Sequence, residues 1–510
     1  MNQRKAGAIL SYISMGFNAL IGFVYVPMLL MFFSKEQYGL YQLVGSMVSY
    51  LTIMDFGLAN TTVRYYSRFL SNGTKQEQEN LLAISLRLYG IIALLMIIAG
   101  IVLLYALIPF YTKTLSPQEI IIAKQVYYVL LINIVVYVVG NIFSAILQAH
   151  QKFIFLRSMQ LVNIIMQPLL VFIFLHFKAS ILVLVIIQTL CNTLLFASNV
   201  YYAFAKLKVK FILHKWDNKF VKEILFFSFF IFLNVIMDQV YWKTGQVILG
   251  AVIGTVSVAV YSVAIQLSMA YMMFSGSMSS VFLPHLSALA AKKDGLAEIN
   301  KIFLKIGRLQ FYIIILVFWG FVLFGRQFIY LWVGDGFKSA YTYTVILMAS
   351  MMISLIQTTG ISILQAKNKH AFRSVLIFIL AILNIIISIP LAKIYGGLAC
   401  ALVTGACLLL GQGLILNIYY SKVIGLEIIE FFKQIIKIFV IVLIPTILFS
   451  IIINKLSLPL SVLSLLLQIA AYTLFFSLFV WFFAFNDYEK DLFSKPFKGI
   501  INILKKCYEK

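Results

Sequence analysis

Charged side chains stand inside several long apolar runs of this sequence, where an ionisable group either carries chemistry or needs a partner. Asp55 lies near the end of the second run, and Asp238 lies well inside the seventh. A charge at the centre of a bilayer costs about 2.5–3.5 kcal/mol on insertion scales. The two carboxylates are therefore candidates for a coupling role in a hydrated cavity, with a structural partner on another helix as the alternative.

Basic side chains form a second group of candidates, made of Arg64, Arg87, Lys243 and Arg308. Cations at the mouth of a cavity would attract an anionic head group. Each of these basic residues also has an alternative role at the membrane surface. Arg87 and Arg308 lie near the ends of their runs, where they could anchor a helix at the interface, and Lys243 could extend its side chain to the surface.

Uncharged polar residues recur at helical spacing in five of the apolar runs. In the fourth run they are Asn133, Tyr137, Asn141, Ser144 and Gln148. This spacing places them on one face of a helix, turned away from lipid. Similar faces add three candidates, which are Asn18 in the first run and Asn234 and Tyr241 in the seventh. Such faces either hydrogen bond between helices or line a cavity, and their presence on five helices favours the cavity.

The elements that position these residues are long enough to cross a membrane. Of the 510 residues, 62% are hydrophobic and 11% are charged, whereas a soluble domain has roughly 25% charged residues. In hydrocarbon only helices satisfy their own backbone hydrogen bonds, and a crossing takes about 20 residues. We therefore predict an all-α polytopic membrane protein. Its roughly 14 transmembrane helices lie near 8–33, 38–60, 82–109, 123–148, 158–177, 180–204, 223–250, 254–282, 307–332, 340–364, 374–393, 396–420, 434–453 and 461–485.

The basic residues also predict the orientation of these helices. Counted over alternate connections, 31 of the 40 Lys and Arg residues fall on the side that holds both termini. Basic residues accumulate on the cytoplasmic side, so both termini are predicted to be cytoplasmic. The net charge of +23 is accounted for by these connections, which contact anionic lipid headgroups, and no nucleic-acid partner is expected.

Two pairs of similar segments indicate an internal repeat. Residues 146–152 resemble 363–369, and 39–41 resemble 259–261. Six predicted helices separate the members of each pair, which is typical of a parallel transporter repeat. The predicted organisation is an N-terminal six-helix lobe (1–204), a basic cytoplasmic linker (205–222), a C-terminal six-helix lobe (223–420), an additional helix pair (421–485) and a cytoplasmic tail (486–510).

The sequence contains no recognisable catalytic or metal-binding pattern. The four cysteines form no Cys-x-x-Cys pair, and three of them lie inside apolar runs, as packing residues do. No connection on the predicted outer side is long enough for a catalytic domain. We therefore expect neither an enzyme nor a cofactor or metal site.

Several short motifs resemble the polysaccharide transport family, which comprises bacterial oligosaccharide-lipid flippases of the multidrug/oligosaccharidyl-lipid/polysaccharide exporter superfamily. In order along the chain they are Tyr38-Gly39-Leu40-Tyr41, Asp55-Phe56-Gly57-Leu58, Val63-Arg64-Tyr65, Val258-Ala259-Val260-Tyr261-Ser262-Val263-Ala264, Ile363-Leu364-Gln365-Ala366, Ile389-Pro390-Leu391 and Tyr395-Gly396-Gly397-Leu398. The similarity extends over most of the chain, and the order and spacing of the motifs carry it.

This resemblance implies two six-helix lobes in a V-shaped arrangement with two extra C-terminal helices. It also implies the activity. The protein would move an undecaprenyl-diphosphate-linked oligosaccharide, such as an O-antigen or another surface polysaccharide repeat unit, across the bacterial inner membrane by alternating access. The diphosphate would meet cationic cavity residues. Membrane lipids and polysaccharide polymerase machinery are the further partners expected.

Two other classes of function compete with this hypothesis. A multidrug or cation antiporter of the same superfamily would use acidic residues for its substrates, and Asp55 and Asp238 keep that alternative open. A membrane polymerase or ligase would need a long catalytic loop on the outer side, and the short connections there argue against it.

Overall fold

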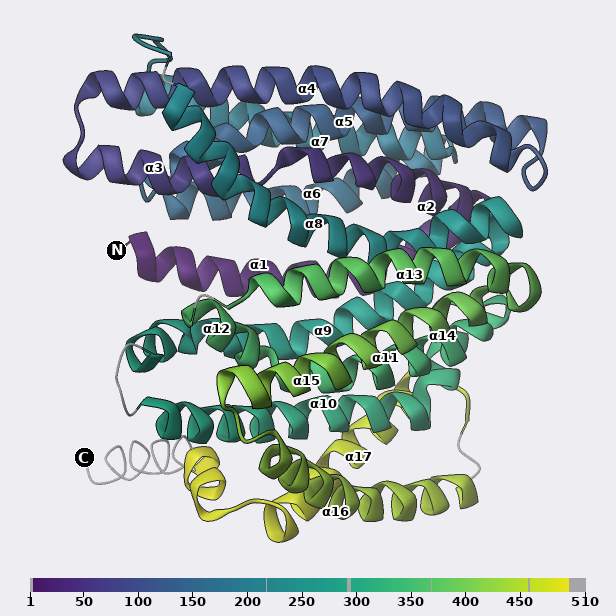
Figure 1. Ribbon diagram of the computed structural model, residues 1–510. Helices are drawn as coiled ribbons and strands as arrows, with labels where there is room; N and C mark the ends of the chain where they lie inside the picture. Colours follow the sequence, from purple (N-terminus) through teal and green to yellow (C-terminus); the bar gives the residue numbers. More distant parts are fainter. Residues whose placement is uncertain (1–2, 217, 291–294, 368, 457–458, 495–510) are drawn as a thin grey trace, which may run out of the picture. The chain divides into compact units, whose positions relative to one another are not determined.

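The protein is helical in the computed structural model, which describes residues 3–216, 218–290, 295–367, 369–456 and 459–494 (Figure 1). No strand occurs in these ranges, so the predicted all-α class is confirmed. Within the helices, the side chains at 4–5, 8, 219–220, 223–235, 237, 276–285, 287 and 290 lie outside the description.

The helices form two compact units. One comprises Met1–Gln266 and Phe372–Cys407, and the other comprises Leu267–Ala371 and Leu408–Lys510. The first unit holds α1 (Gln3–Phe32), α2 (Lys35–Ser49), η1 (Tyr50–Asp55), α3 (Leu58–Asn72), α4 (Lys75–Tyr111), α5 (Pro117–Ala149), α6 (Phe153–Phe177), α7 (Ile181–Tyr201), η2 (Tyr202–Lys206), α8 (Asn218–Val252), the start of α9 (Thr255–Ala290), most of α13 (Ala371–Tyr395) and most of α14 (Gly397–Leu408). The second holds the rest of α9, α10 (Gly295–Val333), η3 (Asp335–Phe337), α11 (Ser339–Ile356), α12 (Thr358–Ala366), η4 (Leu409–Ile415), α15 (Leu416–Tyr419), η5 (Tyr420–Ile424), α16 (Ile428–Lys455) and α17 (Val462–Phe483). The six-helix lobes stay a prediction.

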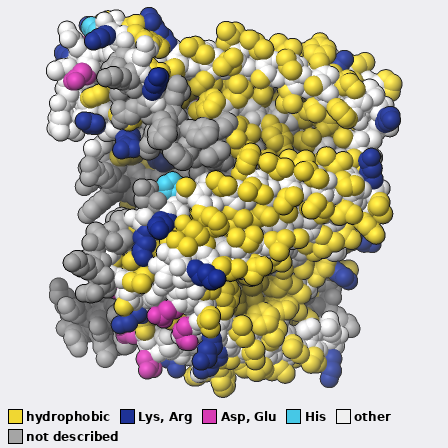
Figure 2. All heavy atoms as spheres, viewed as in Figure 1, with side chains coloured by type: hydrophobic (Ala, Val, Ile, Leu, Met, Phe, Trp, Pro, Cys, Tyr) yellow, Lys and Arg dark blue, Asp and Glu magenta, His cyan; other side chains and the backbone are white. Residues whose placement is uncertain are grey.

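Twelve helices in the described parts of the chain are long and apolar enough to cross a membrane. Apolar side chains cover most of the face in Figure 2, and Lys and Arg gather near its margins. Leu94 and Ile98 on α4, for example, are 59% and 51% exposed, which suits a lipid-facing surface. The protein is therefore a multi-pass membrane protein. The count of fourteen stays a prediction, partly because α8 falls on undescribed side chains at 223–235.

Capping boxes fix where three helices of the first unit begin. The hydroxyls of Ser34, Thr74 and Ser116 accept hydrogen bonds from the backbone N–H three residues later. The side chain of the Gln or Glu at that later position accepts a hydrogen bond from the backbone N–H of the Ser or Thr. These reciprocal bonds satisfy N–H groups that a helix start leaves without partners. They define the starts of α2, α4 and α5. In Figure 1, α4, α5 and α7 then run side by side, in agreement with the contacts of α5 with both neighbours.

The predicted span 38–60 is interrupted, which corrects its description as one continuous helix. α2 ends at Ser49, η1 continues as a tighter helix to Asp55, and α3 begins at Leu58. Between them Phe56 has φ 50° and Gly57 has φ 68°. Both values lie in the left-handed region, which a right-handed helix cannot include and which costs a non-glycine residue of order 1–3 kcal/mol. The chain therefore breaks its helix directly after Asp55.

Gly39 is explained by a close approach within the first unit. A Cβ atom built on Gly39 would overlap the carbonyl oxygen of Thr255 at the start of α9. Only glycine lets the two backbones come so near.

In the second unit, α10 contacts α11, α12, α16 and α17. Side chains on α10, such as Arg308 and Tyr312, can therefore contact several neighbouring helices of this unit.

Candidate functional site

Asp55 occupies the helix break of the first unit with an unsatisfied oxygen. Its Oδ1 atom is buried and has no hydrogen-bond partner among the described residues. The carboxyl group interacts electrostatically with the hydroxyls of Tyr89 on α4 and Tyr137 on α5. Tyr89 is fully buried, and its hydroxyl also has no hydrogen-bond partner in the described part of the chain. Buried polar atoms are normally paired, so this group of side chains is a candidate site.

The C-terminal half of α8 is attached to the helices around this break. The Ser46 hydroxyl of α2 donates to the side-chain oxygen of Gln246, whose amide donates to Ser262 on α9 at 2.9 Å. The hydroxyls of Tyr50 and Thr244 also contact each other. Lys243 precedes Thr244 and is half-buried. These bonds pack the segment of α8 that carries Lys243 against α2 and η1, although the segments are far apart in sequence.

The polar face of the fourth predicted span contacts α7. Asn133 donates to the Thr189 hydroxyl at 3.0 Å and accepts from Asn192 at 3.2 Å, and Asn192 in turn accepts from Asn163 on α6 at 3.2 Å. Asn199 donates to Ser144 at 3.2 Å. For Asn133 the structure therefore shows the interhelical hydrogen bonding that sequence analysis offered as one of two alternatives.

Tyr137 and Gln148 on the same face of α5 have different surroundings. Tyr137 packs edge-on against Phe196 of α7 with ring centroids 5.6 Å apart, and its hydroxyl interacts with the side chain of Asn141 one turn later on α5. Gln148 is half-buried at the end of the helix.

On α7, Gln188 donates to the hydroxyls of Tyr25 at 3.1 Å and Tyr41 at 2.9 Å, so one amide joins α1, α2 and α7.

Three further candidates of the first unit lie on three different helices. Asn18, Arg64 and Arg87 are exposed on α1, α3 and α4. The guanidinium group of Arg64 lies 5.8 Å from the ring centroid of Tyr65. These three side chains therefore belong to three separate helices of the first unit.

The candidates on α8 differ in their surroundings. Tyr241 is buried. Asp238 is exposed and interacts electrostatically with Arg373 of α13. The side chain of Asn234 lies outside the described residues.

Arg308 is engaged in a buried network of the second unit. Its Nε donates to Glu489 Oε1 at 2.7 Å and its Nη2 to Glu489 Oε2 at 2.8 Å, and Nη1 donates to Gln434 of α16 at 3.2 Å. The side chains of Arg308 and Glu489 are only 12% and 2% exposed. Tyr312 adds a hydrogen bond to the Ala484 carbonyl at 2.9 Å. The pair therefore joins α10, α16 and the segment that follows α17.

Sequence reasoning missed Glu489, although a signal existed. Asn486 and Glu489 have the spacing of a capping box, and each accepts a hydrogen bond at 2.9 Å from the other's backbone N–H. This pattern predicts a helix start at Asn486. It does not predict that the same carboxylate also binds an arginine 181 residues away.

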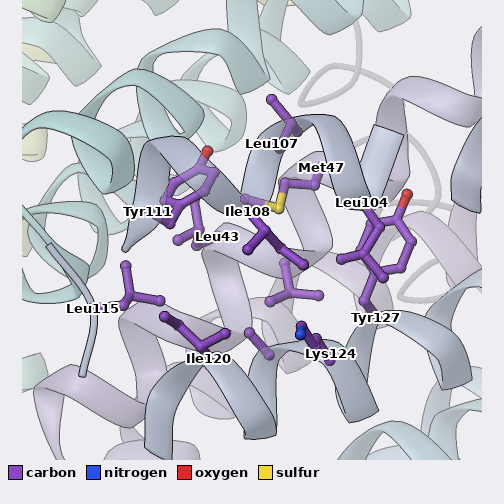
Figure 3. A pocket seen from close by; sticks show the side chains of 12 residues that line it. Leu43, Met47, Leu104, Leu107, Ile108, Tyr111, Leu115, Ile120, Lys124 and Tyr127 are labelled. Atoms are coloured by element: carbon purple, nitrogen blue, oxygen red, sulfur yellow. The ribbon is translucent and has the colours of Figure 1, made fainter. Parts of the chain in front are cut away.

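One well-defined pocket of the first unit is apolar. Residues of α2, α4 and α5 surround it, and Lys124 is the one charged side chain among the residues that line it (Figure 3). Its volume is about 30 Å³, roughly that of one water molecule. It has neither the size nor the polarity to hold a sugar or a phosphate.

Several solved structures of membrane proteins share the fold of this chain. Solved structures with the same fold include one described as lipid II flippase MurJ in an inward closed conformation. It has a TM-score of 0.74 and 17% identity, and the match covers 95% of this chain and 100% of that one. A multidrug resistance MATE family transporter of the MOP superfamily has a TM-score of 0.62 and 16% identity over 80% and 96% of the two chains. A MOP superfamily transporter from Pyrococcus furiosus follows at 0.52 and 16%, over 81% and 95%.

A comparison of the sequence with protein-family models identifies the family of this chain. The family described as polysaccharide biosynthesis protein matches residues 5–290, which is more than half of the chain, and the chain belongs to this family. The comparison with curated protein sequences gives no match. The expected family relationship is thus confirmed, and the fold is shared with solved structures described as a lipid II flippase and as a multidrug transporter.

Proposed function

We propose that this protein is a flippase that moves an undecaprenyl-diphosphate-linked oligosaccharide across the bacterial inner membrane by alternating access. The membership of the polysaccharide biosynthesis family over residues 5–290 is the observation that carries this proposal. A fold shared with a lipid II flippase supports a lipid-linked substrate. The diphosphate cannot enter hydrocarbon unaided because a charge loses its hydration there, so a protein must shield it.

In this proposal cationic residues of the first unit meet the diphosphate. Lys243 is the strongest candidate because it is half-buried on a predicted membrane helix. Arg64 and Arg87 are exposed and could attract the head group before it enters. Arg308 is a weaker candidate, since its guanidinium group already binds both oxygens of Glu489.

Asp55 has a separate role in the proposal. A carboxylate whose Oδ1 has no partner among the described residues, next to two tyrosine hydroxyls, can take up a proton or another small cation. The helix break beside it provides a point where α2 and α3 can reorient. Substrate release would then be coupled to the charge of this one side chain.

Deletion of the gene tests the proposed function. Undecaprenyl-linked repeat units should accumulate on the inner leaflet, surface glycan should decline, and a plasmid copy should restore both. Unchanged surface glycan in a strain without a redundant transporter would contradict the proposal.

A multidrug or cation antiporter is the second candidate. The buried, unpartnered oxygen of Asp55 favours it, since a cationic substrate needs a carboxylate, and so does the fold shared with a MATE transporter. Binding of a cationic dye to the purified protein separates the two. Dye binding that lipid-linked sugar does not displace supports the antiporter.

A further inference from the structure

A pocket of about 420 Å³ lies in the second unit where α10 ends and α11 begins. Besides the apolar Ile329, it is lined by two cations and four hydroxyl-bearing residues, which are Arg326, Lys338, Tyr330, Ser339, Tyr341 and Thr342. This lining carries more polar groups than that of the apolar pocket in Figure 3. Cations and hydroxyl groups together are the donors that a phosphate group needs.

Arg326 is held in position by an aromatic platform. Its guanidinium carbon lies 5.0 Å from the ring centroid of Tyr341. The Tyr341 hydroxyl donates to the Val322 carbonyl at 2.9 Å, and the ring stacks on Phe321 at 5.8 Å. Because the ring is fixed at both its hydroxyl and its face, it restricts the stacked guanidinium group. Arg326 therefore loses less freedom when it binds an anion.

The connection that carries Lys338 is also fixed. Gly334 has φ 91°, and its N–H donates to the carbonyls of Ile329 and Tyr330, so α10 closes in a tight turn. Phe337 is 1% exposed and anchors the turn. Lys338 itself pairs with Asp335 at 2.7 Å, but both side chains are more than 60% exposed. Exposed pairs of this kind contribute little, so a phosphate could displace the carboxylate.

The position of the pocket indicates that its ligand is a lipid. Both α10 and α11 are candidate membrane spans, and the pocket lies at the point where one ends and the other begins. Lipid headgroups occupy that level of a bilayer. Tyr330 is 47% exposed there, as aromatic residues at a membrane interface are.

We propose that this pocket binds the phosphate-bearing headgroup of a membrane lipid while the chain of that lipid stays in the bilayer. Two lipids share this chemistry, namely a bulk anionic phospholipid and the diphosphate lipid that carries the glycan. The second identification rests on the proposed function, and the first does not. From the predicted orientation, the pocket faces the outer leaflet.

The test is a lipid titration of the purified full-length protein, with binding followed by native mass spectrometry. The probes are phosphatidylglycerol, undecaprenyl diphosphate and inorganic pyrophosphate. R326Q and K338Q should each weaken lipid binding about three- to tenfold, as expected for one lost charge-assisted contact. D335N should strengthen it by freeing Lys338. K455Q is the matched control, because Lys455 is an exposed cation at the end of α16 in the same unit.

The outcomes separate the alternatives. Tighter binding of undecaprenyl diphosphate than of phosphatidylglycerol identifies the glycan carrier, and equal binding identifies bulk anionic lipid. An R326Q/K338Q variant that keeps wild-type affinity and its melting temperature overturns the proposal, and so does an equal loss in K455Q. Binding of pyrophosphate without either lipid also overturns it. Because the titration involves no transport, its failure leaves the proposed function untouched.

Discussion

Arg308 on α10 binds Glu489 through two parallel hydrogen bonds of 2.7 and 2.8 Å, although 181 residues separate them. The carboxylate is 2% exposed and also accepts from the backbone N–H of Asn486. One side chain therefore caps the turn after α17 and neutralises the arginine on α10. The C-terminal helix pair is attached to the rest of its unit at this point.

E489Q should destabilise the protein strongly. It leaves the Arg308 charge buried without its partner, which costs about 3–5 kcal/mol for buried pairs. Thermal unfolding of the purified protein should show a clear fall in melting temperature. D335N is the control, since it removes an exposed pair. Equal melting temperatures for the two variants would contradict the role given to Glu489.

G39A should also destabilise the protein. Its Cβ atom would overlap the Thr255 carbonyl, and overpacking of this kind costs typically 1–3 kcal/mol. Gly45 lies on the same helix, and apart from the helix's own neighbouring backbone no atom lies within 4 Å of the corresponding Cβ position, so G45A is a matched control. The melting temperature should fall in G39A and hold in G45A. A G39A protein that unfolds like G45A would show that α2 and α9 approach less closely than described here.

D55N should abolish transport without lowering the stability of the protein. Removing a half-buried charge whose buried Oδ1 has no partner in the described part of the chain should leave the melting temperature unchanged or raise it. Transport should be lost, because asparagine cannot take up a proton. Complementation of the deletion strain measures transport, and D487N at an exposed position is the control. Full complementation by D55N would exclude a coupling role.

His150 should make the stability of the first unit depend on pH. Burial, and to a lesser extent Lys152, lowers the pKa of His150 below its usual 6.5. The ring lies 3.2 Å from the Tyr66 hydroxyl. The fold thus favours the neutral ring, and stability should decrease as the pH falls below about 6.5, where the unfolded chain binds the proton first.

Thermal unfolding at pH 7.5 and 5.5 measures this dependence. H150Q should flatten it, while H176Q, at an exposed position on α6, should not. An unchanged pH dependence in H150Q would assign the effect to another group.

Much of the fold could be predicted from sequence, because long apolar runs leave no alternative to helices in a membrane. Ser34, Thr74 and Ser116 also mark helix starts directly. The break at Phe56 could not be predicted, since only Gly57 carries a conformational signal and glycine is common in membrane helices.

The candidate site was less accessible to prediction. Helical spacing identified the face of Asn133, but spacing does not say whether the neighbour is water or Thr189. The position of Asp55 in an apolar run identified it as unusual, and the structure adds that its Oδ1 is unpaired among the described residues. The partnership of Arg308 depends on tertiary contacts that no local pattern encodes.

Transport by the purified protein tests the central proposal most directly. The protein is reconstituted in vesicles with a fluorescent undecaprenyl-diphosphate oligosaccharide, and a membrane-impermeant quencher reports how much of it reaches the outer leaflet. We predict that quenching rises from about half toward completion with wild-type protein and stays near half with D55N and with empty vesicles. Equal quenching with and without the protein, in vesicles where the protein is folded and inserted, would contradict the proposal.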